Sequence, residues 1–133
     1  RWAASLGALA GAVLEAQVVA HELEFGLTRL DLHGQSLYVP LQHQDIGSTL
    51  RIQVLARNVT LTLQPPAALT SVLNVLRATV VEIAEGAADQ YAVQVKLDVG
   101  APLLASISRK SLHSLALAPG QQLYVMIKAV SLG

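Results

Sequence analysis

The sequence predicts an all-β protein built from two similar halves, and three observations support this prediction. First, short segments alternate apolar and polar residues with period two, most regularly over residues 91–99. Second, turns containing Gly or Pro separate these segments, for example at residues 33–35 and 100–102. Third, similar patterns recur on both sides of Pro65-Pro66, a pair that cannot continue a sheet ladder.

In the first half, we expect strands over residues 9–22, 27–32, 36–41, 51–56 and 58–63. Residues 9–22 are the least regular, because their alanines favour a helix whereas Val13, Val18 and Val19 are β-branched. The likeness of this segment to one in the second half decides for a strand. Pro40 is expected to end the third strand or to mark a sheet edge.

In the second half, we expect strands over residues 70–83, 91–99, 103–107, 123–127 and 130–132, with a turn at 85–89. A short helix is expected after Ser108, which stands where an N-cap residue would stand. This helix should end near the turn at residues 118–120.

The halves are expected to be two copies of one small domain. Residues 1–8 are predicted to be a linker from a missing N-terminal domain, residues 9–64 the first copy and residues 65–133 the second. About five strands in each copy fit two tandem five-stranded OB-like barrels, with the short helix in the second copy. Units of this size bury little surface, so pairing of the two halves or of two chains is expected.

Two sequence offsets relate the copies. Leu9 matches Leu76, an offset of 67 residues (76 − 9), and near the far ends Val59 matches Val130, an offset of 71 residues (130 − 59). The second copy is therefore expected to be longer between these points, with the extra length near the helix.

Composition excludes several classes of function. Of the 133 residues, 53% are hydrophobic and 14% are charged, against an average charged fraction of about 25%. Zero net charge and 4% aromatic residues argue against nucleic-acid binding. With no Cys and no apolar run of about 20 residues, neither disulfides nor a membrane span are expected. Because the sequence begins at Arg1 and lacks a signal peptide, we expect part of a longer, cytosolic protein.

The segment SISRKSLHSLAL, residues 106–117, holds the best candidate binding site. Arg109, Lys110 and Ser111 would form the first helical turn, where backbone N–H groups and the helix dipole attract anions. Two cations in place of the usual acidic residues favour an oxyanion. On this segment alone, an exposed polar turn with solvated cations is the simpler interpretation.

No other residues form a pattern that indicates chemistry. The histidines lack the clustered spacing of metal ligands, so no metal site is expected: His21, His33, His43 and His113. Glu82 and Asp98 are expected on the solvent faces of strands rather than in a catalytic pair.

Three runs in the second half carry a family resemblance: TSVLNVLRATVVEI, VQVKLDVGAPLLASISRKSLHSLAL and PGQQLYVMIKAVSL. They closely resemble the oxyanion-binding Mop fold. With the degenerate first copy, nearly the whole chain resembles the C-terminal tandem Mop domain (di-Mop or TOBE) of the ATPase subunits of molybdate importers. No phosphate loop of the form GxxxxGK(S/T) occurs, so this part of such a protein is not expected to be an enzyme.

The resemblance also implies a binding site. In the family the anion lies between a Ser/Thr-Ser-x-Arg-Asn segment before the first strand and a Lys-Ser pair that opens the helix. Ser71 and Asn74 match the first motif, and Lys110 and Ser111 match the second. Hydroxyl, amide and ammonium donors that converge on four oxygens would suit a tetrahedral dianion, with no acid–base step.

One position departs from the family pattern. Leu73 stands where the family often has Arg, which removes a charge-assisted hydrogen bond worth about 1.5–3 kcal/mol. Arg77 and Arg109 are the candidates to replace it. The first half has no Lys-Ser pair, so it is expected to be a scaffold rather than a second full site.

The resemblance implies a cytoplasmic regulatory domain, at the inner face of the cell membrane, that binds molybdate or tungstate for a transporter. Its expected partners are a second copy through the Mop units, the ATPase domain that precedes it and, indirectly, the membrane permease, but no nucleic acid. The main alternative is a ligand-free structural dimerisation module. A nucleic-acid-binding OB domain is a third, less favoured, hypothesis.

Overall fold

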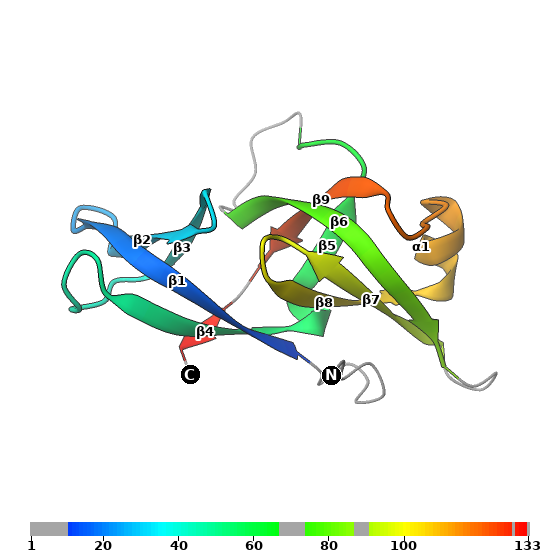
Figure 1. Cartoon of the computed structure of the whole chain (residues 1–133), viewed down its shortest axis with the longest axis horizontal. Helices are drawn as coiled ribbons and strands as arrows, with labels where there is room; N and C mark the ends of the chain where they lie inside the picture. Colours follow the sequence, from blue (N-terminus) through cyan, green and yellow to red (C-terminus); the bar gives the residue numbers. More distant parts are fainter. Residues whose placement is uncertain (1–10, 67–73, 87–90, 129, 133) are drawn as a thin grey trace.

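The computed structural model describes residues 11–66, 74–86, 91–128 and 130–132, which form two five-stranded antiparallel sheets with two short helical segments (Figure 1). The first sheet has the order β10–β4–β1–β2–β3 and the second the order β5–β9–β6–β7–β8. The first sheet contains β1 (Gly11–Glu22), β2 (Leu27–Leu32), β3 (Gln35–Pro40), β4 (Thr49–Leu55) and β10 (Ser131–Leu132). The second contains β5 (Val59–Thr62), β6 (Asn74–Glu85), β7 (Ala92–Asp98), β8 (Pro102–Ser108) and β9 (Gln122–Ile127).

The all-β prediction is confirmed, and each expected strand has a counterpart among the described residues. The short helix is also present, as α1 (Arg109–Ser114). The predicted linker, the start of the strand expected at residues 70–83 and most of the turn expected at 85–89 lie outside the described residues.

The strands expected at 51–56 and 58–63 have different bounds from those predicted, because β4 starts earlier, at Thr49, and ends at Leu55, and β5 spans only Val59–Thr62. Ala56–Asn58 forms a 3-10 turn, η2, between β4 and β5. The reason is topological, because β4 belongs to the first sheet and β5 to the second, so the chain must change direction between them.

The two sheets exchange their edge strands. β5 comes from the first sequence copy but pairs with β9 in the second sheet, with Val59 opposite Ile127. β10 comes from the second copy but pairs with β4, with Leu132 opposite Ile52. The residues before Pro65-Pro66 and those after it therefore each contribute strands to both sheets.

The strand registers decide which sequence offsets hold. β5 on β9 and β10 on β4 occupy equivalent edges, with Leu61 equivalent to Leu132, so the offset of 71 residues (132 − 61) is confirmed. Between β1 and β6, however, the predicted offset of 67 is wrong. The register of β1 shifts between Val18 and Ala20 and that of β6 between Val80 and Glu82, which sets the offset at 62 (80 − 18).

The physical reason for this correction is the alternation of side chains along a strand. The predicted offset differs from the observed one by an odd number of residues, and an odd shift exchanges the two faces of a strand. It matched Val13, which is 50% exposed, with Val80, which is 1% exposed. In the observed register, buried Leu14, Ala16 and Val18 match buried Leu76, Ala78 and Val80.

The buried face of each sheet follows the predicted alternation, with exceptions at Gln94 in β7 and at Leu104 in β8, which is 5% exposed between buried Leu103 and Ala105. Val93, Val95 and Leu97 are buried as expected, but Gln94 between them is only 4% exposed. Its Nε2 donates to Ser106 Oγ at 3.4 Å. Helix α1 contacts both β7 and β8, so β7 is covered on more than one side.

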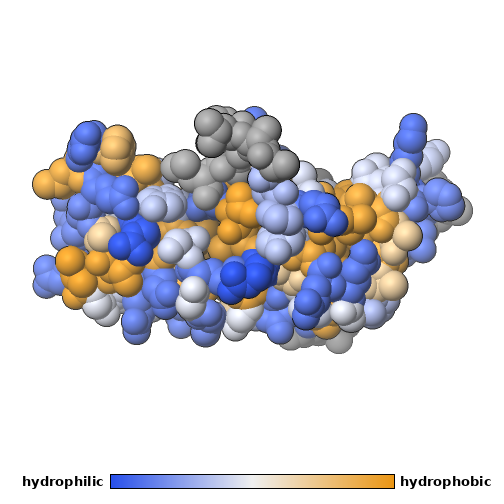
Figure 2. Space-filling view, turned by 90° about the horizontal axis from the view of Figure 1, so that it is seen from above, coloured by the Kyte–Doolittle hydropathy of each residue, from blue (hydrophilic) through white to orange (hydrophobic). Residues whose placement is uncertain are grey.

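Large apolar side chains remain exposed at the end of the molecule formed by the β1–β2 and β3–β4 connections, where Figure 2 shows apolar atoms at the surface. They include Leu23, Phe25 and Ile46. His21 links these two connections, because its Nε2 is 2.6 Å from Gln44 O and its Nδ1 is 2.9 Å from Thr28 Oγ1. A domain this small cannot cover all of its apolar surface by folding alone.

Candidate functional site

Asn74, the first residue of β6, joins the two sheets. Its Nδ2 donates to Tyr38 O at 2.9 Å, and its Oδ1 accepts from Tyr38 N at 2.7 Å. Asn74 is 7% exposed, and Tyr38 lies on β3 of the other sheet. The amide predicted to bind an anion therefore forms a two-point clamp on a neighbouring backbone, which leaves one Nδ2 hydrogen for any other partner.

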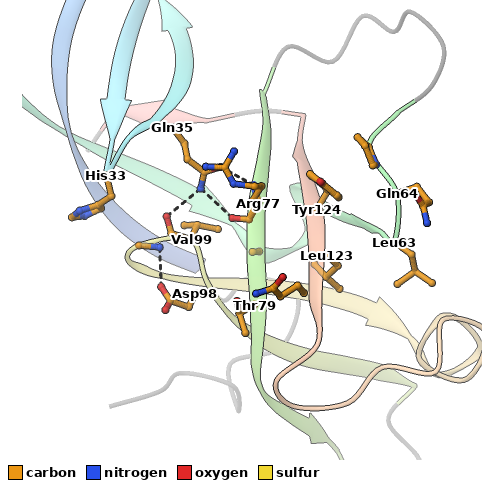
Figure 3. A pocket seen from close by; sticks show the side chains of 14 residues that line it. His33, Gln35, Leu63, Gln64, Arg77, Thr79, Asp98, Val99, Leu123 and Tyr124 are labelled. Carbon is orange, nitrogen blue, oxygen red and sulfur yellow. Dashed lines mark hydrogen bonds between the residues drawn. The ribbon is translucent and has the colours of Figure 1, made fainter.

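A second clamp joins the same two strands. Gln35 Oε1 accepts from Arg77 N at 2.7 Å, and Gln35 Nε2 donates to Arg77 O at 3.1 Å and to Val99 O at 3.4 Å (Figure 3). Together the clamps fix β3 across the first half of β6. With the offset of 62, the position equivalent to Asn74 is Ala12, so the Asn74 clamp has no counterpart in the first sheet.

Ser108 caps the helix, as predicted. The cap uses the Ser111 backbone N–H, one of the donors expected to bind the anion. Ser111 N donates to Ser108 Oγ at 3.0 Å, and Ser108 Oγ donates to Ser111 Oγ at 3.0 Å. Arg109 Nη2 donates to Gly86 O at 3.4 Å, which ties the helix to the end of β6. Lys110 is exposed, and Ser111 is half-buried.

The two predicted motifs are not adjacent within one chain. Figure 1 shows α1 at one end of the molecule, while β6 begins near the middle. The helix contacts β7 and β8, whereas Asn74 lies against β3 and β9. Ser71 and Leu73 lie outside the described residues. A single intramolecular pocket that joins Asn74 to Lys110 and Ser111 is therefore not formed.

Lys128 is an exposed cation at the Asn74 end of β6 that was overlooked in the sequence. Asn74 pairs with Ile127 across β6 and β9, and Lys128 follows directly. Its backbone N–H donates to Asn58 O at 3.0 Å, and the residue is exposed. The signal was present in the run MIKAV, where a lysine follows the last buried residue of an alternating strand.

Known proteins are similar to this chain in sequence or in fold. Residues 70–132 match the family model described as the TOBE domain. These residues form a TOBE domain. The chain is 42% identical to the molybdenum import ATP-binding protein ModC of Albidiferax ferrireducens, over 95% of the chain and 34% of that protein. It is 44% identical to ModC of Pseudomonas fluorescens, over 96% of the chain and 36% of that protein. The chain thus spans about a third of the length of these relatives, in their C-terminal part.

A solved structure shares the fold of most of this chain. It is the cytoplasmic molybdate-binding protein ModG with molybdate bound, with a TM-score of 0.75 and 24% identity, over 92% of this chain and 94% of that one. The TOBE match begins at residue 70 and omits β5, although β5 is an edge strand of the same sheet. The sheet that holds most of the TOBE match therefore includes a strand that precedes the match.

Arg77 lies on the opposite side of β6 from Asn74. The two residues are three positions apart, so their side chains point to opposite faces of the strand, and Arg77 is exposed whereas Asn74 is buried. Position 73 holds Leu where the resembled family often has Arg. Arg77 therefore does not supply the missing guanidinium at the Asn74 end of β6. Arg109 is held near Gly86 and lies with α1.

The described residues of the TOBE domain and its preceding copy contain no group of three or more His, Asp or Glu side chains arranged to hold a metal ion. Across the same residues, no helix has the length and apolarity to cross a membrane. Glu82 and Asp98 are exposed, as predicted, and His113 is exposed as well.

Replacing Ser108 with alanine tests the helix cap of the TOBE domain. The expected loss is about 1 kcal/mol of unfolding free energy, because the Ser111 N–H loses its acceptor. Urea unfolding measures this loss, and faster hydrogen exchange of the Ser111 amide localises it. Ser108→Asp keeps an acceptor and should stay near the wild-type stability. Equal destabilisation by both variants would contradict a capping role.

Proposed function

We propose that this chain is a regulatory domain that binds molybdate, or the similar dianion tungstate, for a molybdate importer. The relatives are named as molybdenum import ATP-binding proteins, and the structural neighbour is named as a molybdate-binding protein with molybdate bound. The observation on this chain that carries the proposal is the placement of Lys128 beside the Asn74 end of β6, at the start of the TOBE match. The proposed barrels are OB-like units, each completed by its exchanged strand.

We propose that the site is completed between two copies of the chain. Ser71, Asn74 and Lys128 would come from one copy, and Lys110 and Ser111, whose hydroxyl hydrogen still faces no described acceptor, from the other. Two ammonium groups would balance a dianion, and hydroxyl and amide donors would orient its oxygens. This arrangement accounts for the distance between α1 and Asn74 within one chain (Figure 1).

The proposed mechanism is a shift between two states of the transporter. An anion held between two copies stabilises the arrangement in which those copies touch. The ATPase domain would precede this domain in the cytoplasm, and this domain would act on the permease only indirectly. By linkage, the pairing of copies and the affinity for the anion must increase together.

Molybdate should raise the melting temperature of the chain, and sulfate at the same concentration should not. At a molybdate concentration of 100 times Kd, the expected stabilisation is about 2.7 kcal/mol. Lys128→Ala and Lys110→Ala should each reduce the shift, whereas Arg57→Ala, which removes an exposed cation in η2, should not. Differential scanning fluorimetry and isothermal titration calorimetry measure both effects. No shift at millimolar molybdate would end the proposal.

The two lysine variants also separate two forms of the site. If only Lys128→Ala abolishes binding, the site lies at the Asn74 end of one chain and needs no second copy. If both abolish it, mixing the two inactive variants should restore part of the binding, because a mixed dimer contains one intact site.

A ligand-free dimerisation module is the second candidate. Two observations favour it. Leu73 stands in place of an arginine, and both the oxygen and the nitrogen of the Asn74 side-chain amide are hydrogen-bonded to Tyr38. Sedimentation analysis distinguishes the two functions. The structural module predicts a dimer whose dissociation constant does not change on adding molybdate.

A further inference from the structure

A cavity of about 640 Å³ lies beside Arg77 on the exposed face of β6 (Figure 3). Arg77 and Thr79 of β6 and Tyr124 of β9 line it, and Leu63 and Pro65 from the segment after β5 add apolar atoms. Arg77 and Tyr124 are direct cross-strand partners, and Leu63 is 39% exposed. The cavity thus combines one cation, one acid (Asp98), neutral donors and apolar surface, and its volume falls within the range of small-ligand pockets, about 300–1,000 Å³.

The Arg77 guanidinium has no ion pair or hydrogen bond to any other residue in the described part of the chain. Its backbone, in contrast, is held on both sides by Gln35. The acidic residue of the cavity, Asp98, already accepts from Gly100 N at 2.8 Å within the β7–β8 turn. In the cavity, the backbone of the cationic residue Arg77 is fixed by Gln35. The carboxylate of Asp98 accepts a hydrogen bond within the β7–β8 turn.

The first sheet contains an equivalent cavity of reversed charge. It has a volume of about 360 Å³, and Glu15, Gln17, Asp31 and Thr49 are among its lining residues. The offset of 62 between β1 and β6 makes Glu15 equivalent to Arg77. One cavity thus carries a cation where the other carries an acid, on nearly the same backbone. The smaller cavity, with Glu15 and Asp31, disfavours anions, whereas in the larger one Arg77 balances Asp98 and offers a cation to a ligand.

We propose that the cavity beside Arg77 binds a small organic anion, one with a single carboxylate or phosphate group on an apolar or aromatic body. The Arg77 guanidinium would hold the acidic group by paired hydrogen bonds. The Tyr124 ring, Leu63 and Pro65 would contact the body. This site is separate from the proposed molybdate site, because Arg77 and Asn74 lie on opposite faces of β6.

A nuclear magnetic resonance titration of the ¹⁵N-labelled chain with phenyl phosphate tests the proposal. Amide signals of Arg77, Thr79 and Tyr124 should shift with saturation, whereas those of Gln17 and Thr49 should not. Arg77→Gln, which keeps the backbone clamp to Gln35, should weaken binding at least ten-fold. Glu15→Lys should add saturable shifts at Gln17 and Thr49. An unchanged spectral dispersion in each variant shows that the fold is retained.

Each other result would overturn the proposal. Equal affinity for phenyl phosphate in wild type and Arg77→Gln would remove the role of the cation. Inorganic phosphate binding as tightly as phenyl phosphate would remove the role of the apolar wall. Displacement of phenyl phosphate by molybdate would make this cavity part of the oxyanion site. If molybdate fails to bind anywhere, the result for phenyl phosphate is unaffected, so the two proposals fail separately.

Discussion

Asn74→Ala should lower the free energy of unfolding by about 2–4 kcal/mol, because it leaves two part-buried backbone groups of Tyr38 without a protein partner. Asn74 accepts from Tyr38 N at 2.7 Å and donates to Tyr38 O at 2.9 Å, and it is 7% exposed. Urea unfolding followed by circular dichroism measures the change. Gln53→Ala is the matched control, because it removes an exposed amide from a strand without a clamp.

Asn74→Asp separates the two hydrogen bonds of the clamp. A carboxylate at this position accepts from the Tyr38 N–H but cannot donate to the Tyr38 carbonyl at neutral pH. We therefore expect Asn74→Asp to be destabilised as well, despite its nearly identical shape. If Asn74→Ala unfolds at the same urea concentration as the wild type, the clamp does not hold the sheets together. In that case the Asn74 side chain is available for a ligand.

Gly100→Ala should lower the unfolding free energy by about 1–3 kcal/mol more than Gly34→Ala, because the new methyl group meets a fixed neighbour. Both glycines have positive φ, +98° at Gly100 and +90° at Gly34, so both substitutions carry a similar backbone cost. A Cβ at Gly100 would lie 2.6 Å from His33 Cβ, whereas one at Gly34 would have nothing within 4 Å. The difference between the variants therefore measures the packing of one hairpin turn against the other.

A double variant checks the cause of this difference. His33→Ala keeps the Cβ that lies nearest to Gly100, so it should not rescue Gly100→Ala, whereas His33→Gly should. For each His33 substitution, thermal and urea unfolding of the wild type, the two single variants and the double variant gives the coupling free energy. Equal stability of Gly34→Ala and Gly100→Ala would contradict this packing. It would mean that the turn at Gly100 can move away from His33 without a loss of unfolding free energy.

The strands were predictable because burial imposes a period of two on the sequence. Val93, Val95 and Leu97 are buried as their spacing indicates, and the registers confirm that Leu61 matches Leu132. The error between β1 and β6 has the same origin. Short runs of Ala, Val and Leu match one another at several offsets, and only the pairing at the bulges after Val18 and Val80 selects one.

The candidate site was less predictable than the strands. Ser108 was correctly identified as a helix cap, because a cap depends on residues next to each other in the chain. The role of Asn74 was not visible, because its partner Tyr38 is 36 residues away. Lys128 was overlooked for the same reason, since its position beside Asn74 comes from the β6–β9 register.

The all-β class, the capped helix and the resemblance to a molybdate-importer domain could be derived from the residues alone. Each depends on local spacing or on residue types that can be matched along the chain. Only the tertiary structure decided the exchange of β5 and β10, the clamp of Asn74 on Tyr38 and the separation of α1 from Asn74. These depend on which edges pair, and edge pairing minimises unsatisfied backbone groups across the whole molecule rather than within any one segment.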